Sequence, residues 1–248
     1  MTEEVRDWWE ATADYFQDEI DMDVGINWTG QWAPEVDLFD DGDLAGAAVL
    51  ELGCGGGQCT VAVAQRGADV TGIDLSAAQL AHARDLAAEH DVDADLLQAD
   101  VTDLGMFADG SFDVAFNAWV FQWVGDLAAC FDETYRVLRP GGRFVFSVPH
   151  PFFDVVDPDS LQVVDSYFDT GRQVVSHDGG DVDQVTYRHS VGGVHNALRE
   201  AGFQIEQLLE PGIDDPDAYG SGPWGEFVPE LLHRVPSVLI VDAKKPRL

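Results

Sequence analysis

The segment that decides the fold is Val49-Leu50-Glu51-Leu52-Gly53-Cys54-Gly55-Gly56-Gly57, an apolar run that ends in a cluster of glycines. A chain that leaves a buried strand and turns at once into a helix needs positive φ angles, or no Cβ, at several positions. Glycine also leaves the backbone bare where a ligand approaches closely. A second apolar run, residues 70–73, ends at Asp74. Because an aspartate in this place can accept both hydroxyls of a ribose, the two segments together predict a nucleotide-binding unit.

The glycine spacing argues against two other nucleotide-binding motifs. The dinucleotide pattern G-x-G-x-x-G, counted from Gly53 and Gly55, requires a third glycine or an alanine where Gln58 stands. A phosphate-binding loop requires a lysine after its last glycine, and the only lysines of the chain are Lys244 and Lys245. A nicotinamide-dependent oxidoreductase is therefore a disfavoured alternative.

Apolar runs and helical patterns alternate through the first part of the chain. We predict strands near 48–53, 69–74, 95–99, 112–117 and 142–148, and helices near 57–66, 76–90 and 127–138. This alternation is typical of an α/β domain with a doubly wound parallel sheet and right-handed crossovers. A helix near 192–201 and apolar runs at 203–209 and 237–243 extend the pattern.

Two segments do not follow this alternation. Residues 1–45 predict an N-terminal cap, made of an amphipathic helix near 3–20 and a loop. Residues 150–190 lack a helical period and predict an insertion over the active site. A chain of 248 residues, 46% of them hydrophobic, can bury one large core, so we expect residues 1–248 to form a single domain.

The ordered features resemble the class I S-adenosylmethionine-dependent methyltransferases, and among them the small-molecule enzymes of methyltransferase type 11. The family motif E-x-G-x-G-x-G matches Glu51, Gly53, Gly55 and Gly57, and further matches are Asp74 and the segments 98–101, 112–117 and 135–142. The resemblance implies a Rossmann-like, mostly parallel sheet of seven strands, with an antiparallel last strand and helices on both faces. It also implies transfer of a methyl group from S-adenosylmethionine to a small-molecule acceptor.

The resemblance places the cofactor at the carboxyl ends of the strands, where ligands of open α/β sheets bind. The glycine turn would pack against the methionine part, Asp74 would hold the ribose, and Asp100 would accept a hydrogen bond from the adenine. Asn117 and Ala118 would line the floor under the sulfonium. The full set of implied cofactor-binding residues is Glu51, Gly53, Cys54, Gly55, Asp74, Leu75, Asp100, Val101, Asn117 and Ala118.

The acceptor side is indicated by aromatic and histidine residues. A base is needed only when the acceptor still carries its proton, and His150 is the best-placed candidate because Pro149 and Pro151 fix its backbone after the fifth strand. His177 and His189 are the other candidate bases, and a structural histidine is the alternative in each case. Residues predicted to line the acceptor site, between the N-terminal helix and the insertion, are Tyr15, Trp28, Trp32, Trp119, Trp123 and His189. Such a pocket suits a flat or apolar small molecule.

The chain carries 46 acidic and 13 basic residues, a net charge of −33. Because the acids are spread along the whole chain, we favour adaptation to a salt-rich cytoplasm, where salt screens their repulsion, over an ordinary acidic surface. Such a surface repels phosphate backbones, so we expect no nucleic-acid partner. No apolar stretch approaches the roughly 20 residues that span a bilayer, and no signal peptide is readable. We expect a halophilic, cytoplasmic monomer or homodimer without a membrane partner.

Cys54, Cys59 and Cys130 are three cysteines without zinc-ligand spacing, so we expect neither a disulfide nor a metal site. The sequence does not name the acceptor or decide among oxygen, nitrogen and carbon methylation. A non-catalytic, cofactor-binding module is the alternative to an enzyme.

Overall fold

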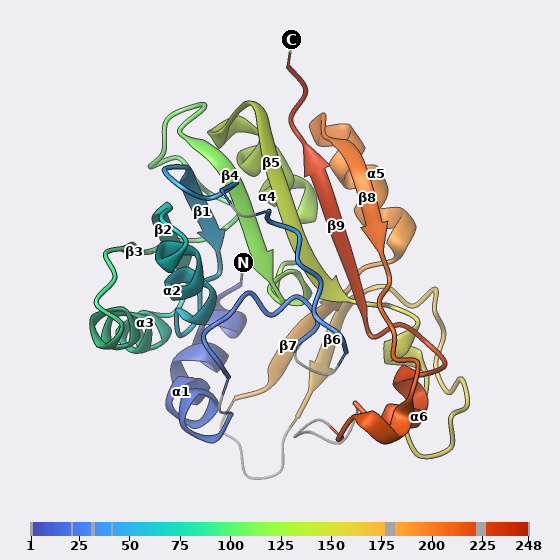
Figure 1. The fold of residues 1–248 in the computed structure, drawn as a ribbon. Coiled ribbons are helices and arrows are strands. Elements are labelled where there is room, and N and C mark those ends of the chain that lie inside the picture. Colours follow the sequence, from blue (N-terminus) through green and yellow to red (C-terminus); the bar gives the residue numbers. More distant parts are fainter. Residues whose placement is uncertain are drawn as a thin grey trace.

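The computed structural model describes residues 2–20, 22–30, 33–40, 42–176, 182–221 and 227–247. Its centre is a seven-stranded sheet with the order β3-β2-β1-β4-β5-β9-β8 (Figure 1). The strands are β1 (Ala48–Leu52), β2 (Asp69–Asp74), β3 (Asp95–Gln98), β4 (Phe112–Ala118), β5 (Leu138–Pro149), β8 (Gln204–Leu209) and β9 (Val238–Lys244). Strand β9 pairs antiparallel with β5 and β8, and the other neighbours pair in parallel. The predicted fold class is confirmed.

The described helices begin at a capping side chain in four cases and without one in the other two. They are α1 (Glu3–Glu19), α2 (Gln58–Gln65), α3 (Ala77–Glu89), α4 (Leu127–Val137), α5 (Val191–Ala201) and α6 (Pro229–Leu232). The side chains of Thr2, Ser76, Asp126 and Ser190 each accept a backbone N–H from the first turn that follows. Helix α5 ends at Gly202, whose φ of +103° is the left-handed conformation common at helix ends. None of the described helices combines the length and apolarity that crossing a membrane requires.

Two apolar clusters cover the two faces of the sheet. On one face α4 packs on β5, and α5 packs on α4 and β8, with Phe131, Phe146 and Leu198 fully buried. On the other face α2 packs on β2, and the segment that leads from α1 to β1 crosses the neighbouring strands (Figure 1). Trp28 and Phe39 of this segment are each 1% exposed. The predicted loop therefore supplies part of the core where no helix covers the sheet.

The predicted insertion at 150–190 contains elements that its sequence pattern does not predict. It includes a 3-10 turn, η2 (Phe153–Val155), and a separate antiparallel hairpin of β6 (Gly171–Val175) and β7 (Gln184–Arg188). Strand β7 packs on α1 and on η1 (Phe121–Trp123). The hairpin, α1 and α6 lie at the end of the sheet toward which β1, β4 and β5 point (Figure 1). His177 lies outside the described residues.

Candidate functional site

The turn between β1 and α2 presents bare backbone at the carboxyl end of β1. Gly53, Gly55 and Gly57 have φ angles of +73°, +50° and +88°, which residues with a Cβ rarely adopt. The N–H groups of Gly53 and Cys54 donate to the carbonyl of Ile73 at 2.8 and 2.9 Å. These two bonds fix the turn against the end of β2. Burial raises the pKa of the Cys54 thiol, so this side chain is neutral.

Asp74 connects the end of β2 to the glycine turn. Its Oδ2 accepts the N–H of Gly55 at 2.9 Å, and its Oδ1 accepts the N–H of Ser76 at 2.8 Å. Burial raises the pKa of Asp74, and the two N–H groups oppose that rise. Each carboxylate oxygen keeps a second lone pair. The structure thus brings Asp74 and the glycine turn together, as the sequence predicts.

The neighbouring strand end carries the residues predicted for the adenine. The N–H of Ala99 donates to the Asp74 carbonyl at 2.9 Å, which places Asp100 beside the end of β2. Asp100 Oδ1 accepts the N–H and the hydroxyl of Thr102 at 2.9 and 2.7 Å. Val101 is buried, and Leu75 packs against the cluster formed by α1 and β7. Asp74 and Leu75 therefore lie at the end of β2, and Asp100 lies just past the end of the adjacent strand β3, at the same edge of the sheet.

Glu51 is a buried carboxyl in the middle of this arrangement. It is 3% exposed, and the Thr60 hydroxyl donates to its Oε2, joining β1 to the first turns of α2. Burial raises the pKa of Glu51 to about 8, although the Thr60 bond opposes the rise. The side chain is therefore mostly protonated at neutral pH, and it can both donate and accept a hydrogen bond.

The raised pKa of Glu51 predicts a pH dependence of stability. The folded state keeps a proton that the unfolded state releases above pH 4.5, so the stabilisation is complete below that pH and is lost as the pH rises toward 8. Between pH 5 and 8 the free energy of unfolding should fall by on the order of a few kcal/mol more in the natural protein than in Glu51→Gln. Urea unfolding at each pH measures the difference. Parallel pH profiles for the two proteins would contradict this assignment.

Asn117, near the end of β4, is fully buried with an unused amide. Neither its Oδ1 nor its Nδ2 has a hydrogen-bond partner among the residues that the structure describes. A buried amide left unpaired costs about 1–3 kcal/mol, so this side chain indicates a polar ligand group. Ala118 and Trp119 follow, and Trp119 has a φ of +60°. Such backbone strain in a non-glycine residue often marks a functional site.

Three of the residues predicted to line the acceptor site are used in packing or in tying elements together. Trp28 packs on Phe39 and Phe116 in the core, with ring centroids 5.9 and 6.2 Å apart. Trp123 packs on Trp9 of α1, and together with buried Val5 and Val185 it forms a small core between α1 and the hairpin. His189 Nε2 lies 3.1 and 2.9 Å from the carbonyls of Phe121 and Val124. The predicted acceptor space between α1 and the insertion is filled by packing at these positions.

The remaining candidates are scattered. Tyr15 is 63% exposed on α1, and Trp119 packs on Phe227 with ring centroids 5.9 Å apart, next to α6. Trp32 lies outside the described residues. Only Trp119 directly follows a strand end that also carries a predicted cofactor residue, Asn117. The structure therefore does not gather the five described residues of this set into one wall.

His150 is held by both of its ring nitrogens. Its Nε2 lies 2.8 Å from Glu210 Oε1, and its Nδ1 accepts the N–H of Phe152 at 3.2 Å. Burial lowers the pKa of His150, and Glu210 opposes that change. The ring is thus neutral, with its proton on Nε2 directed at Glu210. Glu210 is a functional candidate that the sequence reasoning missed, although its place directly after the apolar run at 203–209 is a signal of the same kind as that of Asp74.

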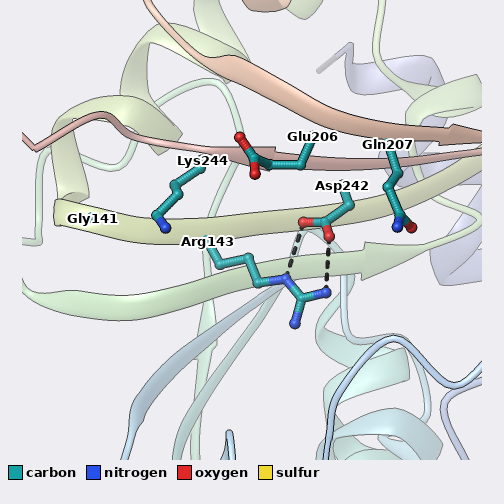
Figure 2. A pocket seen from close by; sticks show the side chains of 6 residues that line it. All are labelled: Gly141, Arg143, Glu206, Gln207, Asp242 and Lys244. Atoms are coloured by element: carbon teal, nitrogen blue, oxygen red, sulfur yellow. Dashed lines mark hydrogen bonds and ion pairs between the residues drawn. The ribbon is translucent and has the colours of Figure 1, made fainter.

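A separate hollow lies at the other end of the strands. It is lined by Gly141, Arg143, Glu206, Gln207, Asp242 and Lys244, and Arg143 forms a two-pronged ion pair with Asp242 at 3.0 and 2.9 Å (Figure 2). Arg143 stands near the beginning of β5, whereas His150 follows its end. This hollow is therefore remote from the glycine turn. Within the described ranges, no three His, Cys, Asp or Glu side chains gather as metal ligands would.

Comparison with known proteins assigns the central region. Residues 50–146 match the family model described as a methyltransferase domain. The ubiquinone biosynthesis O-methyltransferase of Pseudomonas aeruginosa is 34% identical over 140 residues, 56% of each chain. The malonyl-[acyl-carrier protein] O-methyltransferase of Salmonella typhimurium is 41% identical over 101 residues, 41% of this chain and 38% of that protein. The chain spans about half the length of the curated relatives it matches, or less.

Solved structures extend the similarity to most of the chain. The geranyl diphosphate C-methyltransferase of Streptomyces coelicolor shares the fold at 20% identity, with a TM-score of 0.61, over 83% of this chain and 75% of that one. An S-adenosylmethionine-dependent methyltransferase from Mesorhizobium loti is 30% identical, with a TM-score of 0.68, over 89% of this chain and 98% of that one. Because the Mesorhizobium loti methyltransferase is 30% identical and is matched over 98% of its own length, this protein belongs to the class I S-adenosylmethionine-dependent methyltransferases.

Proposed function

We propose that this protein transfers a methyl group from S-adenosylmethionine to a small-molecule acceptor. The observation that carries the proposal is the shared position of the glycine turn, Asp74 and the unpaired amide of Asn117 at the ends of three adjacent strands. S-adenosylmethionine, when bound, supplies a methyl group already activated on a sulfonium. The task left to the protein is to align the acceptor and to exclude water.

The residues at this edge fit the cofactor. A Cβ placed on Gly55 would meet nothing nearer than Gln79 Oε1 at 3.8 Å, so the backbone of the turn is open to a ligand. The two oxygens of Asp74 suit the two hydroxyls of a ribose, and Asp100 suits an adenine amino group. Asn117 offers both a donor and an acceptor from beneath. Leu75 and Val101 complete the proposed binding set around the adenine, and Ala118 adds to the floor beside Asn117.

On the acceptor side we assign separate tasks to His150 and Glu210. The imidazole donates from Nε2 to Glu210 and accepts at Nδ1 from Phe152, so it has no lone pair left to take a proton in this arrangement. The Glu210 side chain is 52% exposed, against 7% for His150. Glu210 is therefore the member of the pair that can meet an acceptor, and His150 orients it. Trp119, Tyr15 and Trp32 stay proposals for the apolar wall.

This assignment predicts matching effects for two variants. Glu210→Gln and His150→Ala should each lower kcat by about a hundredfold, since both remove an oriented carboxylate that would receive the acceptor's proton. The Kd for S-adenosylmethionine should change less than about twofold, because neither residue meets the cofactor. Transfer of a labelled methyl group and calorimetry measure the two quantities.

Glu206→Gln is the matched control. Glu206 lies on β8, the strand that Glu210 directly follows, but it lines the remote hollow. This variant should leave both quantities unchanged. If variants at Glu210 and His150 retain full turnover, the pair takes no part in methyl transfer. If they lose affinity for S-adenosylmethionine, the pair belongs to the cofactor site and not to the acceptor site.

The proposed function is tested by incubating the protein with methyl-labelled S-adenosylmethionine and a small-metabolite extract, followed by identification of the labelled product. Hydroxyl and carboxyl acceptors come first, because the curated relatives are O-methyltransferases. Thermal stabilisation by S-adenosylmethionine but not by NAD would separate this function from a nicotinamide-dependent one. Stabilisation without any labelled product from any extract would favour a non-catalytic, cofactor-binding module.

We further propose that the protein works in a salt-rich cytoplasm as a monomer or homodimer. The support is the net charge of −33, which favours a hydrated, salt-screened surface and disfavours contact with nucleic acid.

A further inference from the structure

Helix α1 touches the glycine turn through one side chain, Gln17. A Cβ added to Gly56 would overlap the Gln17 carboxamide. Unlike Gly55 and Gly57, Gly56 is not among the glycines with a positive φ. The backbone conformation therefore does not require glycine at position 56, but a Cβ there would oblige the Gln17 carboxamide to move.

Gln17 is the middle member of a ladder of three carboxamides. Gln58 Nε2, at the start of α2, donates to Gln17 Oε1 at 2.7 Å, and Gln17 Nε2 donates to Gln79 Oε1 of α3 at 2.9 Å. Gln79 is 2% exposed, and its Oε1 is also the atom nearest to a Cβ placed on Gly55. The ladder thus runs beside the glycine turn and joins three helices that lie together in Figure 1.

Two further contacts hold α1 in this position. Glu10 accepts the N–H groups of Ala77 and Ala78 at the start of α3, at 2.6 and 3.3 Å. Asp14 lies 2.8 Å from His82 Nε2, one turn further along α3. The place of Gln17 over the turn is therefore set by its helix as well as by its own hydrogen bonds.

The methionine part of S-adenosylmethionine ends in a carboxylate and an ammonium group. Within the described part of the chain, no Lys or Arg forms a hydrogen bond or ion pair with the glycine turn or with the three glutamines. A carboxamide nitrogen carries two N–H donors, and the ladder uses one from Gln17 and one from Gln58. The second donor of each amide can serve a carboxylate, and the amide oxygens can serve an ammonium group.

We propose that Gln17, together with Gln58 and Gln79, recognises the amino-acid end of the methyl donor. The inference rests on the proposed function and adds to it the residues that bind the amino-acid end of the cofactor. The N–H donors for the carboxylate come from neutral amides and not from a lysine or arginine. Because Gln17 stands on α1, the same contacts join cofactor binding to the docking of α1 over the site.

The test compares ligands with and without the amino-acid end. Calorimetry measures the affinities of S-adenosylmethionine, S-adenosylhomocysteine and 5′-methylthioadenosine, which keeps the nucleoside but lacks the amino acid. In Gln17→Met the first two affinities should fall about ten- to a hundredfold, as expected for lost hydrogen bonds to charged groups, while the third stays within about twofold. Ala11→Met places the same side chain at an exposed position of α1 and should change none of the three.

A second variant, Gly56→Ala, disturbs the contact between Gln17 and the glycine turn by changing the turn. The Cβ of Gly56→Ala displaces Gln17, so it should reproduce the selective loss, and in a Gln17→Ala background it should cost nothing further. Equal loss for all three ligands would mean that Gln17 only holds α1, and additive losses would separate Gly56 from Gln17. Either result overturns the inference. If the natural protein binds none of the three ligands, the proposed function fails first.

Discussion

Replacement of Asp74 by alanine should weaken S-adenosylmethionine binding about a hundredfold or more while the fold persists. The substitution removes two charge-assisted hydrogen bonds to ribose hydroxyls, each contributing roughly 1.5–3 kcal/mol. It also removes the acceptor of the Gly55 N–H, so the glycine turn loses one of the three bonds described above that hold it beside β2. Calorimetry measures the affinity, and circular dichroism checks that the sheet and helices are retained.

Asp69→Ala is the matched control for Asp74→Ala. Asp69 begins the same strand, is exposed, and carries the same charge at the opposite end of the sheet. Its loss should leave the affinity for S-adenosylmethionine unchanged. This comparison separates the loss of a ribose contact from the effect of removing one negative charge anywhere on the strand. Unchanged affinity in a folded Asp74→Ala protein would remove Asp74 from the site.

The parts of the fold that the sequence predicts are those set by local chemistry. Buried runs such as residues 49–52 specify strands, and the positive φ angles of Gly53, Gly55 and Gly57 specify the turn that follows. Parallel topology then brings the ends of successive strands to one edge without further information. For this reason the amino-acid sequence alone is enough to place Asp74, Asp100 and Asn117 at one edge of the sheet.

The parts that the sequence does not reveal depend on distant partners. In the hairpin, Gly171 pairs with Arg188, and the burial of β7 is confined to Val185, so its alternation is weak. The sequence around Trp28 predicts an aromatic residue in a loop. Its burial is not apparent because the sheet face that it covers is built from other segments. Glu210 lies 60 residues beyond His150, and only the fold brings the two side chains together.

Dilution of salt should destabilise the protein strongly. The screening length is about 3 Å at 1 M salt and about 10 Å at 0.1 M, so repulsion among carboxylates that molar salt suppresses returns on dilution. With a net charge of −33, we expect Tm to fall by about ten degrees or more between 2 M and 0.1 M potassium chloride, equivalent to a few kcal/mol. Thermal unfolding followed by circular dichroism at several salt concentrations measures the change.

Two kinds of variant separate screening of repulsion from other effects of salt. Asp85→Asn and Asp93→Asn neutralise exposed carboxylates, so each should raise Tm in dilute salt while leaving it nearly unchanged in molar salt. Asp113 instead pairs with Arg139 and accepts the N–H of Ala48, so Asp113→Asn should lower Tm at both concentrations. Asp85→Asn and Asp93→Asn should reduce the difference in Tm between dilute and molar salt, because they remove repulsion. Asp113→Asn instead removes an attraction. A Tm that stays constant or rises on dilution would contradict adaptation to salt, since an uncompensated charge of this size would then be stable without screening.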